Sequence, residues 1–314
     1  LVAADCGAGV TRIDAHPDNI IGAALKLGEV MALTRNESCV HEKVGVYDDY
    51  HPGPHAAMTL AEDIDLRMFP KHWQHAFMVE KPGESGPRRS LQVFDAAGDA
   101  VHKIFLRDGS NHDAWEGLKA ELALENQSPE QPVEPRQPAE TPKSDPAKAD
   151  ILRKEWARLT DTHQFLRLCS KLKMNRLGAY RIAGEPLARL VEPGAVDMAL
   201  QKLATDGTEV MIFVGNRGCI QIHTGPVKTL KAMGPWQNVL DPGFNLHLRL
   251  DHIAEVWAVD KPTQRGAAVS LEAFDAEGGL ILQIFGVGKE GRDSRPAWRE
   301  LVSGLPSVRA EEQA

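Results

Sequence analysis

Short runs of alternating apolar and polar residues recur along the chain and predict β-strands, because successive side chains of a strand point to opposite faces. In the second half, EVMIFV and CIQIH flank Gly215-Asn216-Arg217, which predicts a hairpin, and FNLHLR, EVWAV, VSLEAF and LILQIF follow as four more strands. A turn signature, DAEG at 275–278, separates the last two runs, and DAAG stands at 95–98 in the first half. We therefore expect each half to be mostly an antiparallel meander.

Helical patterns stand mainly at the ends of the two halves, where apolar residues recur at three- and four-residue spacing. They predict helices over residues 111–122, 149–158, 161–173, 195–204 and 294–303. Strands and helices segregated in this way favour the α+β class. We expect each half to form a large antiparallel β-sheet with flanking helices.

The chain contains an internal repeat at a constant offset of 180 positions. EVMALTRNESCVHEKVG at 29–45 aligns with EVMIFVGNRGCIQIHTG at 209–225, and Glu, Val, Met, Asn, Cys and Gly residues match. The same register continues without a gap until Ile104-Phe105 aligns with Ile284-Phe285. Self-similarity over this length indicates a duplicated domain and predicts a tandem structural repeat.

A proline-rich segment separates the two repeats. Residues 125–150 contain six prolines and almost no large apolar side chain, so they cannot bury a core of their own. The sequence thus predicts an N-terminal repeat over 1–124 that is truncated at its start, an extended and mobile linker over 125–150, and a C-terminal repeat over 151–314. Only the second repeat has a long leading segment, 151–190, before the repeat register begins.

Composition places the chain among ordinary globular proteins. Of its 314 residues 42% are hydrophobic and 25% charged, and the net charge of -8 disfavours a nucleic-acid partner without excluding a local basic patch. The four cysteines show no CxxC spacing, and no run of 18 apolar residues or signal peptide is present, so we expect a cytoplasmic protein. No HExxH, GxGxxG, P-loop or GxSxG motif supports a standard hydrolase or nucleotide-dependent enzyme.

An arginine and an aromatic residue share one face of a predicted strand in the first half. Arg67 and Phe69 alternate with apolar neighbours, and the pair suits a flat anionic ligand, because guanidinium binds carboxylates and stacks on aromatic faces. A solvated sheet face with an incidental phenylalanine is the alternative interpretation. The opposite face of this strand holds Ile64, Leu66 and Met68.

The last strand of each repeat also places a polar side chain beside an aromatic one. In the second half Gln283 and Phe285 share a face with Ile281, and in the first half Lys103 and Phe105 are their counterparts. Gln283 is therefore a candidate ligand contact. The alternative is that it is simply an exposed strand residue.

His163 is the most specific single candidate. Thr160 or Asp161 can cap the helix that follows, which places His163 in its first turn. A neutral imidazole there suits an iron ligand or a general base. A structural histidine beside apolar surface is the alternative, although only the second repeat has this segment. The expected apolar face of the helix is Phe165, Leu166, Cys169 and Leu172.

Several strings of the second half resemble the HemS/HmuS family, the cytoplasmic haem-utilisation proteins of Gram-negative bacteria. They are LTDTHQF, FVGNRGCIQIHTGPV, MGPWQNVLD, FNLHLRLDHIAEVW and LEAFDAEG. The first half resembles the N-terminal repeat of the same family through ALTRNESCVHEK, EDIDLRMFP and RRSLQVFDAAGDAVHKIFLR. The resemblance covers nearly the whole chain apart from the linker.

The resemblance implies two similar halves and one haem (iron protoporphyrin IX), held in a cleft of the second half. The axial histidine of the family matches His163, and its distal arginine, which reaches over from the first half, matches Arg67. The positions that line the haem or contact its propionates match Phe69, Lys261, Gln283 and Phe285. Where a basic residue is expected shortly after the last strand, the chain reads Gly286-Val287-Gly288-Lys289, so this contact is either displaced to Lys289 or missing.

The resemblance implies two activities that the sequence hardly separates. One is haem degradation with a supplied electron source, and the other is delivery of haem from an inner-membrane transporter to a haem oxygenase. We expect haem binding and trafficking to be primary. A haem-responsive interaction protein or DNA-linked regulator is the alternative, and a basic surface patch would be its sign.

Overall fold

The computed structural model describes residues 2–84, 86–289 and 291–308. Two compact units divide the chain, and neither is one continuous segment. Unit 1 comprises Leu1–Gln137, Phe213–His223 and Asp241–Leu246, and unit 2 comprises Pro138–Ile212, Thr224–Leu240 and His247–Ala314. Among the helices of the described ranges, none is long and apolar enough to cross a membrane.

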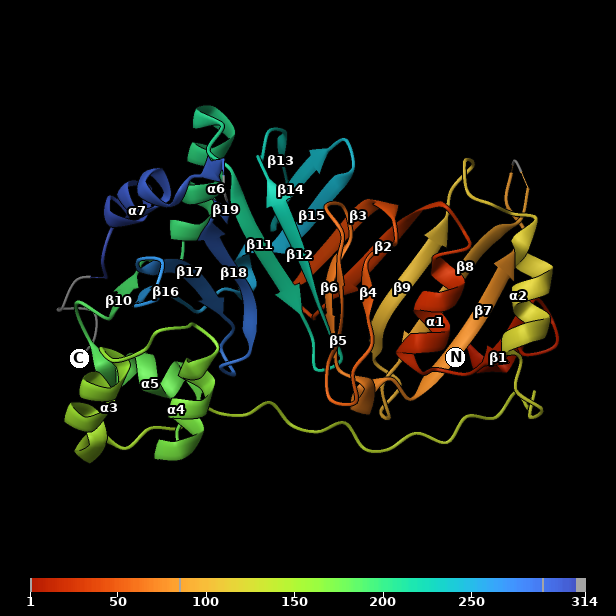
Figure 1. Cartoon of the computed structure of the whole chain (residues 1–314), viewed down its shortest axis with the longest axis horizontal. Coiled ribbons are helices and arrows are strands. Elements are labelled where there is room, and N and C mark those ends of the chain that lie inside the picture. Colours follow the sequence, from red (N-terminus) through yellow and green to blue (C-terminus); the bar gives the residue numbers. More distant parts are fainter. Residues whose placement is uncertain (1, 85, 290, 309–314) are drawn as a thin grey trace. The chain divides into compact units, whose positions relative to one another are not determined.

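Two nine-stranded antiparallel sheets form the framework (Figure 1). The order of the first sheet is β1 (Val10–Ile13), β7 (His75–Lys81), β8 (Arg88–Phe94), β9 (Ala100–Leu106), β2 (Glu29–Arg35), β3 (Cys39–Val46), β15 (Phe244–Arg249), β14 (Trp236–Asp241) and β13 (Leu230–Met233). The order of the second sheet is β10 (Ala188–Val191), β16 (Glu255–Lys261), β17 (Ala268–Phe274), β18 (Leu280–Gly286), β11 (Val210–Gly215), β12 (Cys219–Gly225), β6 (Asp65–Met68), β5 (Ala57–Leu60) and β4 (Tyr50–His51). A short hairpin is formed by β19 (Gly288–Lys289) and β20 (Arg292–Asp293).

The tandem repeat and the α+β class are confirmed. The two sheets have the same strand order once each element is replaced by its equivalent 180 positions away, and even a register shift recurs, at Val93/Phe94 and at Ala273/Phe274. The helices are α1 (Pro17–Ala24), α2 (Ala114–Leu122), α3 (Ala149–Trp156), α4 (Gln164–Leu172), α5 (Arg176–Ala183), α6 (Ala195–Asp206) and α7 (Arg295–Ser303), with short 3-10 turns at Ala3–Asp5, Pro70–His72, Pro146–Lys148 and Leu250–His252.

The expectation that each half is a meander is wrong for three strands of each repeat. After its first hairpin, each repeat sends these strands to the sheet that carries the other repeat: β6 pairs with β12, with Met68 opposite Cys219. Within unit 1, the amide of Val44 on β3 also donates to the carbonyl of Gly243 beside β15 (2.9 Å). Alternation along a strand determines which face is buried but not which strand is its neighbour, so the sequence pattern left this exchange undetected.

Two eight-residue helices, α1 and α5, were not predicted. Their start signals are local: Pro17 stands at the first position of α1, and the Asn175 side chain accepts a hydrogen bond from the amide of Gly178 at the start of α5 (3.0 Å). Each helix is too short for a periodic apolar pattern to stand out. Its stability depends on tertiary packing.

The proline-rich segment has no helix or strand over residues 125–145 but is hydrogen-bonded in both units. In unit 1 the Arg12 guanidinium donates to the carbonyls of Ser128 (2.7 Å) and Glu130 (3.0 Å). In unit 2 Asn175 donates to the Thr141 carbonyl (2.8 Å). Regular structure begins again at Pro146, inside the range taken as linker, because Asp145 caps the short turn that leads into α3.

The core of unit 2 is an aromatic cluster between its helices and its sheet. Phe165 of α4 lies 4.5 Å from the ring centre of Trp156 on α3 and 5.5 Å from that of Tyr180 on α5. Tyr180 in turn contacts Trp257 on β16 at 6.2 Å. Such large buried rings contribute much of the packing energy of a core, so this cluster holds α3, α4 and α5 together on the sheet (Figure 1).

Candidate functional site

His163 stands at the start of α4 with its imidazole in solvent. It is the N-cap residue rather than a member of the first turn, and its side chain is 93% exposed. Asp161 Oδ1 accepts hydrogen bonds from both the backbone amide and Nδ1 of His163, each at 2.7 Å. These two bonds lower the pKa of Asp161, so the carboxylate stays ionised. With Nδ1 as the donor, Nε2 carries the lone pair and is open to a ligand.

The turn before α4 fixes where that imidazole sits. Gln164 closes a reciprocal pair with Thr160: its side-chain oxygen accepts from the Thr160 amide and its nitrogen donates to the Thr160 hydroxyl, both at 3.0 Å. The Thr160 carbonyl also accepts from the amide of Gln264, in the loop after β16 (3.0 Å). The ligand position is thus anchored to the sheet on one side and to α4 on the other.

The expected apolar face of α4 is wrong at one position. Phe165, Cys169 and Leu172 are buried as expected, but Leu168 completes the buried face and Leu166 is 52% exposed. Leu166 follows His163 by three residues, a spacing that puts both side chains on the same side of a helix. The exposed imidazole therefore has an exposed apolar neighbour.

Three other residues implied by the resemblance share one sheet face in unit 2. The register of β16, β17 and β18 sets Trp257 opposite Glu272 and Glu272 opposite Gln283. Lys261 and Phe285 lie on this face too, by the two-residue period of a strand. Gln283 and Phe285 are partly exposed, whereas Lys261 is 3% exposed.

Lys261 belongs to a buried cluster of charged and polar side chains around Glu272. The Glu272 carboxylate, 0% exposed, accepts from Lys261 Nζ (2.8 Å), Ser270 Oγ (2.7 Å), Arg176 Nη1 (3.0 Å) and the Tyr180 hydroxyl (2.9 Å). Lys261 also donates to the Tyr180 hydroxyl (2.9 Å) and lies 5.0 Å from the ring centre of Phe165. Its ammonium therefore points into the helix–sheet interface, and a direct bond to a propionate would require it to leave Glu272.

The charges in this cluster do not cancel. Burial alone would raise the pKa of Glu272, but Lys261 and Arg176 outweigh burial and hold that pKa well below its usual range. Burial lowers the pKa of Lys261, and Glu272 opposes this shift. When Lys261 is protonated, two cations face one carboxylate. The excess positive charge lies on the same sheet face as Gln283 and Phe285, where it favours an anionic group.

Arg67 and Phe69 lie in unit 1, on β6 and just after it. The alternation expected for this strand is confirmed, because Leu66 and Met68 are fully buried while the side chain of Arg67 is 33% exposed. Arg67 forms an ion pair with Asp65 on the same face and donates to the Leu66 carbonyl (3.0 Å). The guanidinium is therefore held along its own strand.

Lys289 is exposed on β19, paired with Arg292 of β20 in the short hairpin. The structure places it at the surface, after the last long strand. The expected role of Lys289 as the displaced basic contact stays a prediction.

Cys39 and Cys219, at equivalent positions of the two repeats, are both buried. Burial raises the pKa of Cys219 to about 12 and also raises that of its repeat equivalent Cys39, so both thiols stay protonated. Among the described residues, no group of three or more His, Cys, Asp or Glu side chains could hold a bare metal ion. A single imidazole is nevertheless a complete protein ligand for an iron whose other ligands belong to a porphyrin.

Sequence reasoning missed two groups that position the candidate ligand. Asp161 was considered only as a cap, although a carboxylate two residues before a histidine is the local signal for a bond to Nδ1. The Glu272 cluster had a weaker signal, a lone carboxylate inside the strand VSLEAF whose repeat equivalent is Gln92. Its partners Arg176 and Tyr180 come from an unpredicted helix, so only tertiary structure reveals them.

Comparisons with known proteins cover nearly the whole chain. The family model described as the haemin-degrading HemS.ChuX domain matches residues 1–122 and 173–305. The hemin transport protein HmuS of Yersinia pestis is 37% identical over 302 residues, which are 95% of this chain and 86% of that protein.

Two solved structures are similar at the level of the whole chain. Holo-PhuS, a heme-binding protein from Pseudomonas aeruginosa, has a TM-score of 0.93 and 42% identity over 98% of this chain and 90% of that chain. ChuS, a heme-degrading enzyme of Escherichia coli O157:H7, has a TM-score of 0.89 and 33% identity over the same shares, 98% and 90%. The similar proteins thus include one described as a transport protein, one as a binder and one as an enzyme.

The contribution of the buried cluster to the free energy of unfolding can be tested. In Glu272→Gln, Lys261 and Arg176 lose their counter-charge inside the protein, and we expect the free energy of unfolding to fall by about 3 kcal/mol. The wild type should lose the same contribution on acidification: it is complete above about pH 5 and lost as the pH falls below the ~4.3 of an unfolded glutamate.

Urea denaturation of both proteins between acidic and neutral pH measures this difference. Ser270→Ala is the matched control, because it removes one hydrogen bond to the same carboxylate and should cost only about 1 kcal/mol. Equal stabilities of Glu272→Gln and the wild type at neutral pH would show that the cluster does not hold the helices on the sheet.

Proposed function

The chain belongs to the HemS/ChuX family of haem-utilisation proteins, and on that premise we propose that it binds one haem through His163 and carries it from a transporter to a haem-processing enzyme. The observation that carries the proposal is the bond between Asp161 and His163 Nδ1, which leaves Nε2 free at an exposed helix start. This is the tautomer that an axial iron ligand requires. A carboxylate on the opposite ring nitrogen also fixes the orientation of the ligating ring.

The surroundings of His163 support a flat, amphipathic ligand. Leu166 offers apolar surface beside the imidazole, and Phe285 offers an aromatic face. Gln283 offers an amide for a carboxylate, and the positive charge in excess over Glu272 favours propionates at that sheet face. In this proposal Lys261 acts on a propionate through its charge, since its ammonium is already bonded.

Delivery is favoured over degradation by the exposure of the ligand. An imidazole with 93% of its side chain in solvent can bind and release iron without opening a core, as a carrier requires. The partners proposed for a carrier are an inner-membrane haem transporter and a haem oxygenase, in the cytoplasm of a bacterial cell. The similar proteins described as transport and binding proteins support this proposal, and ChuS supports degradation as the second candidate.

Absorption spectra separate these two activities. Hemin added to the full chain should give a saturable Soret band, with one haem bound per chain. With ascorbate under air, a carrier keeps most of this band, and the haem then moves to added apo-haem oxygenase. Loss of the Soret band with biliverdin-type products would overturn delivery as the primary role and leave binding intact.

The axial assignment predicts the effect of three substitutions. His163→Ala should shift the Soret and charge-transfer bands and speed haem release at least about tenfold, because only porphyrin burial and propionate contacts remain. Asp161→Ala should keep the ligand but weaken ferric haem binding by about 10- to 100-fold, since the tautomer is no longer fixed. His247→Ala is the control, because His247 is another histidine of the second repeat but lies on strand β15 rather than at the start of α4. Unchanged spectra in His163→Ala with altered spectra in His247→Ala would move the ligand onto the sheet.

Arg67 and Phe69 remain part of the proposal through the family resemblance. In Arg67→Ala we expect a changed iron spin state, because a cationic donor at the distal face is removed, while the pattern of axial nitrogen ligation persists. Resonance Raman spectra of the ferric complex report the spin state of the iron and its nitrogen ligation. Asp65→Asn, which frees Arg67 from its ion pair, is the matched comparison. If the spin state of Arg67→Ala equals that of the wild type, Arg67 has no role at the iron.

A further inference from the structure

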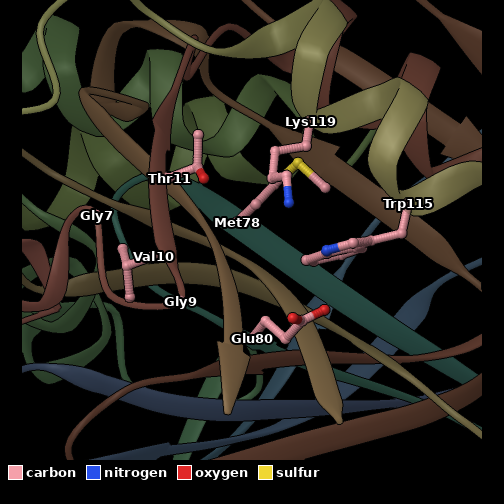
Figure 2. Close-up of a pocket in the computed structure, with 8 residues that line it drawn as sticks. All are labelled: Gly7, Gly9, Val10, Thr11, Met78, Glu80, Trp115 and Lys119. Atoms are coloured by element: carbon pink, nitrogen blue, oxygen red, sulfur yellow. The ribbon is translucent and has the colours of Figure 1, made fainter.

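A second candidate binding site lies in unit 1, where β1, β7 and α2 meet (Figure 2). The cavity measures about 190 Å³. Met78 and Trp115 are its buried side chains, whereas Glu80 and Lys119 stand partly exposed at its mouth. It is a small amphipathic pocket, too small for a porphyrin.

Trp115 presents an unused hydrogen-bond donor to this pocket. The residue is 1% exposed, and no acceptor among the described residues binds its Nε1. Arg89 fixes the indole from one side, with its guanidinium carbon 5.5 Å from the ring centre, and is itself bonded to Glu80 (2.6 Å). A buried N–H without an acceptor is costly, so its persistence points to an acceptor supplied by a ligand.

In the second repeat, protein groups occupy the position that is equivalent to this pocket. Trp298 of α7 is the equivalent of Trp115, and its Nε1 donates to the carbonyl of Val269 (3.0 Å). Thr11, opposite Met78, is equivalent to Arg189, opposite Ala258. Arg189 spans from β10 to the end of α7 and donates to the carbonyls of Val302 (2.7 Å) and Leu305 (2.9 Å). The short Thr11 leaves the corresponding space open.

Two glycines, Gly7 and Gly9, line the other side of the pocket. Gly9 has a φ of +87°, and a Cβ there would lie 2.5 Å from the carbonyl oxygen of Glu80. Gly7 likewise has a positive φ, +86°. A side chain at either position is strained, so this wall stays open to a small molecule.

We propose that this pocket binds a short-chain carboxylate, whose oxygens accept hydrogen bonds from Trp115 Nε1 and the Lys119 ammonium while its aliphatic part packs against Met78. Figure 2 shows the indole nitrogen and the Lys119 nitrogen both directed into the pocket. Lys119 also pairs with Glu116 at the rim (2.6 Å), which holds the ammonium in place. Glu80 also lines the pocket, and its carboxylate would attract a ligand that carries an ammonium group beside its carboxylate. The proposal does not depend on haem.

Binding can be followed through the indole N–H signal of Trp115 in a nitrogen–proton NMR correlation spectrum of the full chain. Of the six tryptophans, Trp115 is identified by loss of its signal in Trp115→Phe. Sodium propionate should shift this signal saturably and leave the Trp298 signal in place, because the Trp298 N–H is already bonded. L-alanine, which is propionate with an added ammonium, tests Glu80: tighter binding indicates an amino acid as the ligand, and weaker binding a plain carboxylic acid.

Three variants separate binding in the pocket from general anion effects. Thr11→Arg copies the second repeat and should abolish the propionate shift, whereas Thr11→Ser should retain it. Lys119→Met, on the helix surface, should weaken propionate binding by about tenfold, because one charge-assisted hydrogen bond is lost. Since Lys119 is partly exposed, this variant folds even if Thr11→Arg does not.

Three results would overturn the proposal. One is a propionate shift that stays linear up to about 100 mM or appears on all the indoles, because it reflects ionic strength alone. Another is saturation that is unchanged in Lys119→Met. The last is a response to ethylammonium but not to propionate, which would make Glu80 the anchor and a cation the ligand.

Discussion

Glu272 is a carboxylate with no exposed surface that accepts hydrogen bonds from two cations, a tyrosine and a serine. Two of its donors, Arg176 and Tyr180, come from α5, and a third, Lys261, ends β16. Desolvation makes such a charge unfavourable unless all its partners are in place, so the helices and the sheet must meet in one arrangement. The ring of Phe165, two residues after His163, lies directly against Lys261 and Tyr180. The position of the candidate iron ligand therefore depends on this carboxylate.

The same cluster explains how an exposed histidine can still be precisely placed. His163 has almost no packing of its own, and its orientation comes from Asp161 and from the Thr160–Gln164 pair. These local bonds fix the imidazole relative to α4, and the cluster fixes α4 relative to the sheet. Rigid support beneath a solvent-exposed ligand suits a protein that must release what it binds.

Duplication lets each repeat serve as an internal reference for the other. The second repeat carries Glu272 where the first has Gln92. The first repeat leaves a pocket at Thr11 where the second is closed by Arg189. Equivalent backbones with different side chains show that the fold itself requires neither feature. Differences between the copies thus indicate function more sharply than the shared core does.

The sequence by itself determined the repeat, its α+β class and the faces of its strands, because a two-residue period and a constant offset are local properties of the chain. It also singled out His163, through its place before an amphipathic helix. The exchange of β4–β6 and β13–β15 between sheets depended on which edges meet, which alternation does not encode. Likewise, the resemblance implied that Lys261 lines the haem or contacts its propionates, and only the tertiary structure shows its ammonium turned inward to Glu272 and Tyr180. Long-range contacts of this kind are decided by packing and desolvation in three dimensions, so the buried cluster and the pocket beside Trp115 emerged only from the tertiary structure.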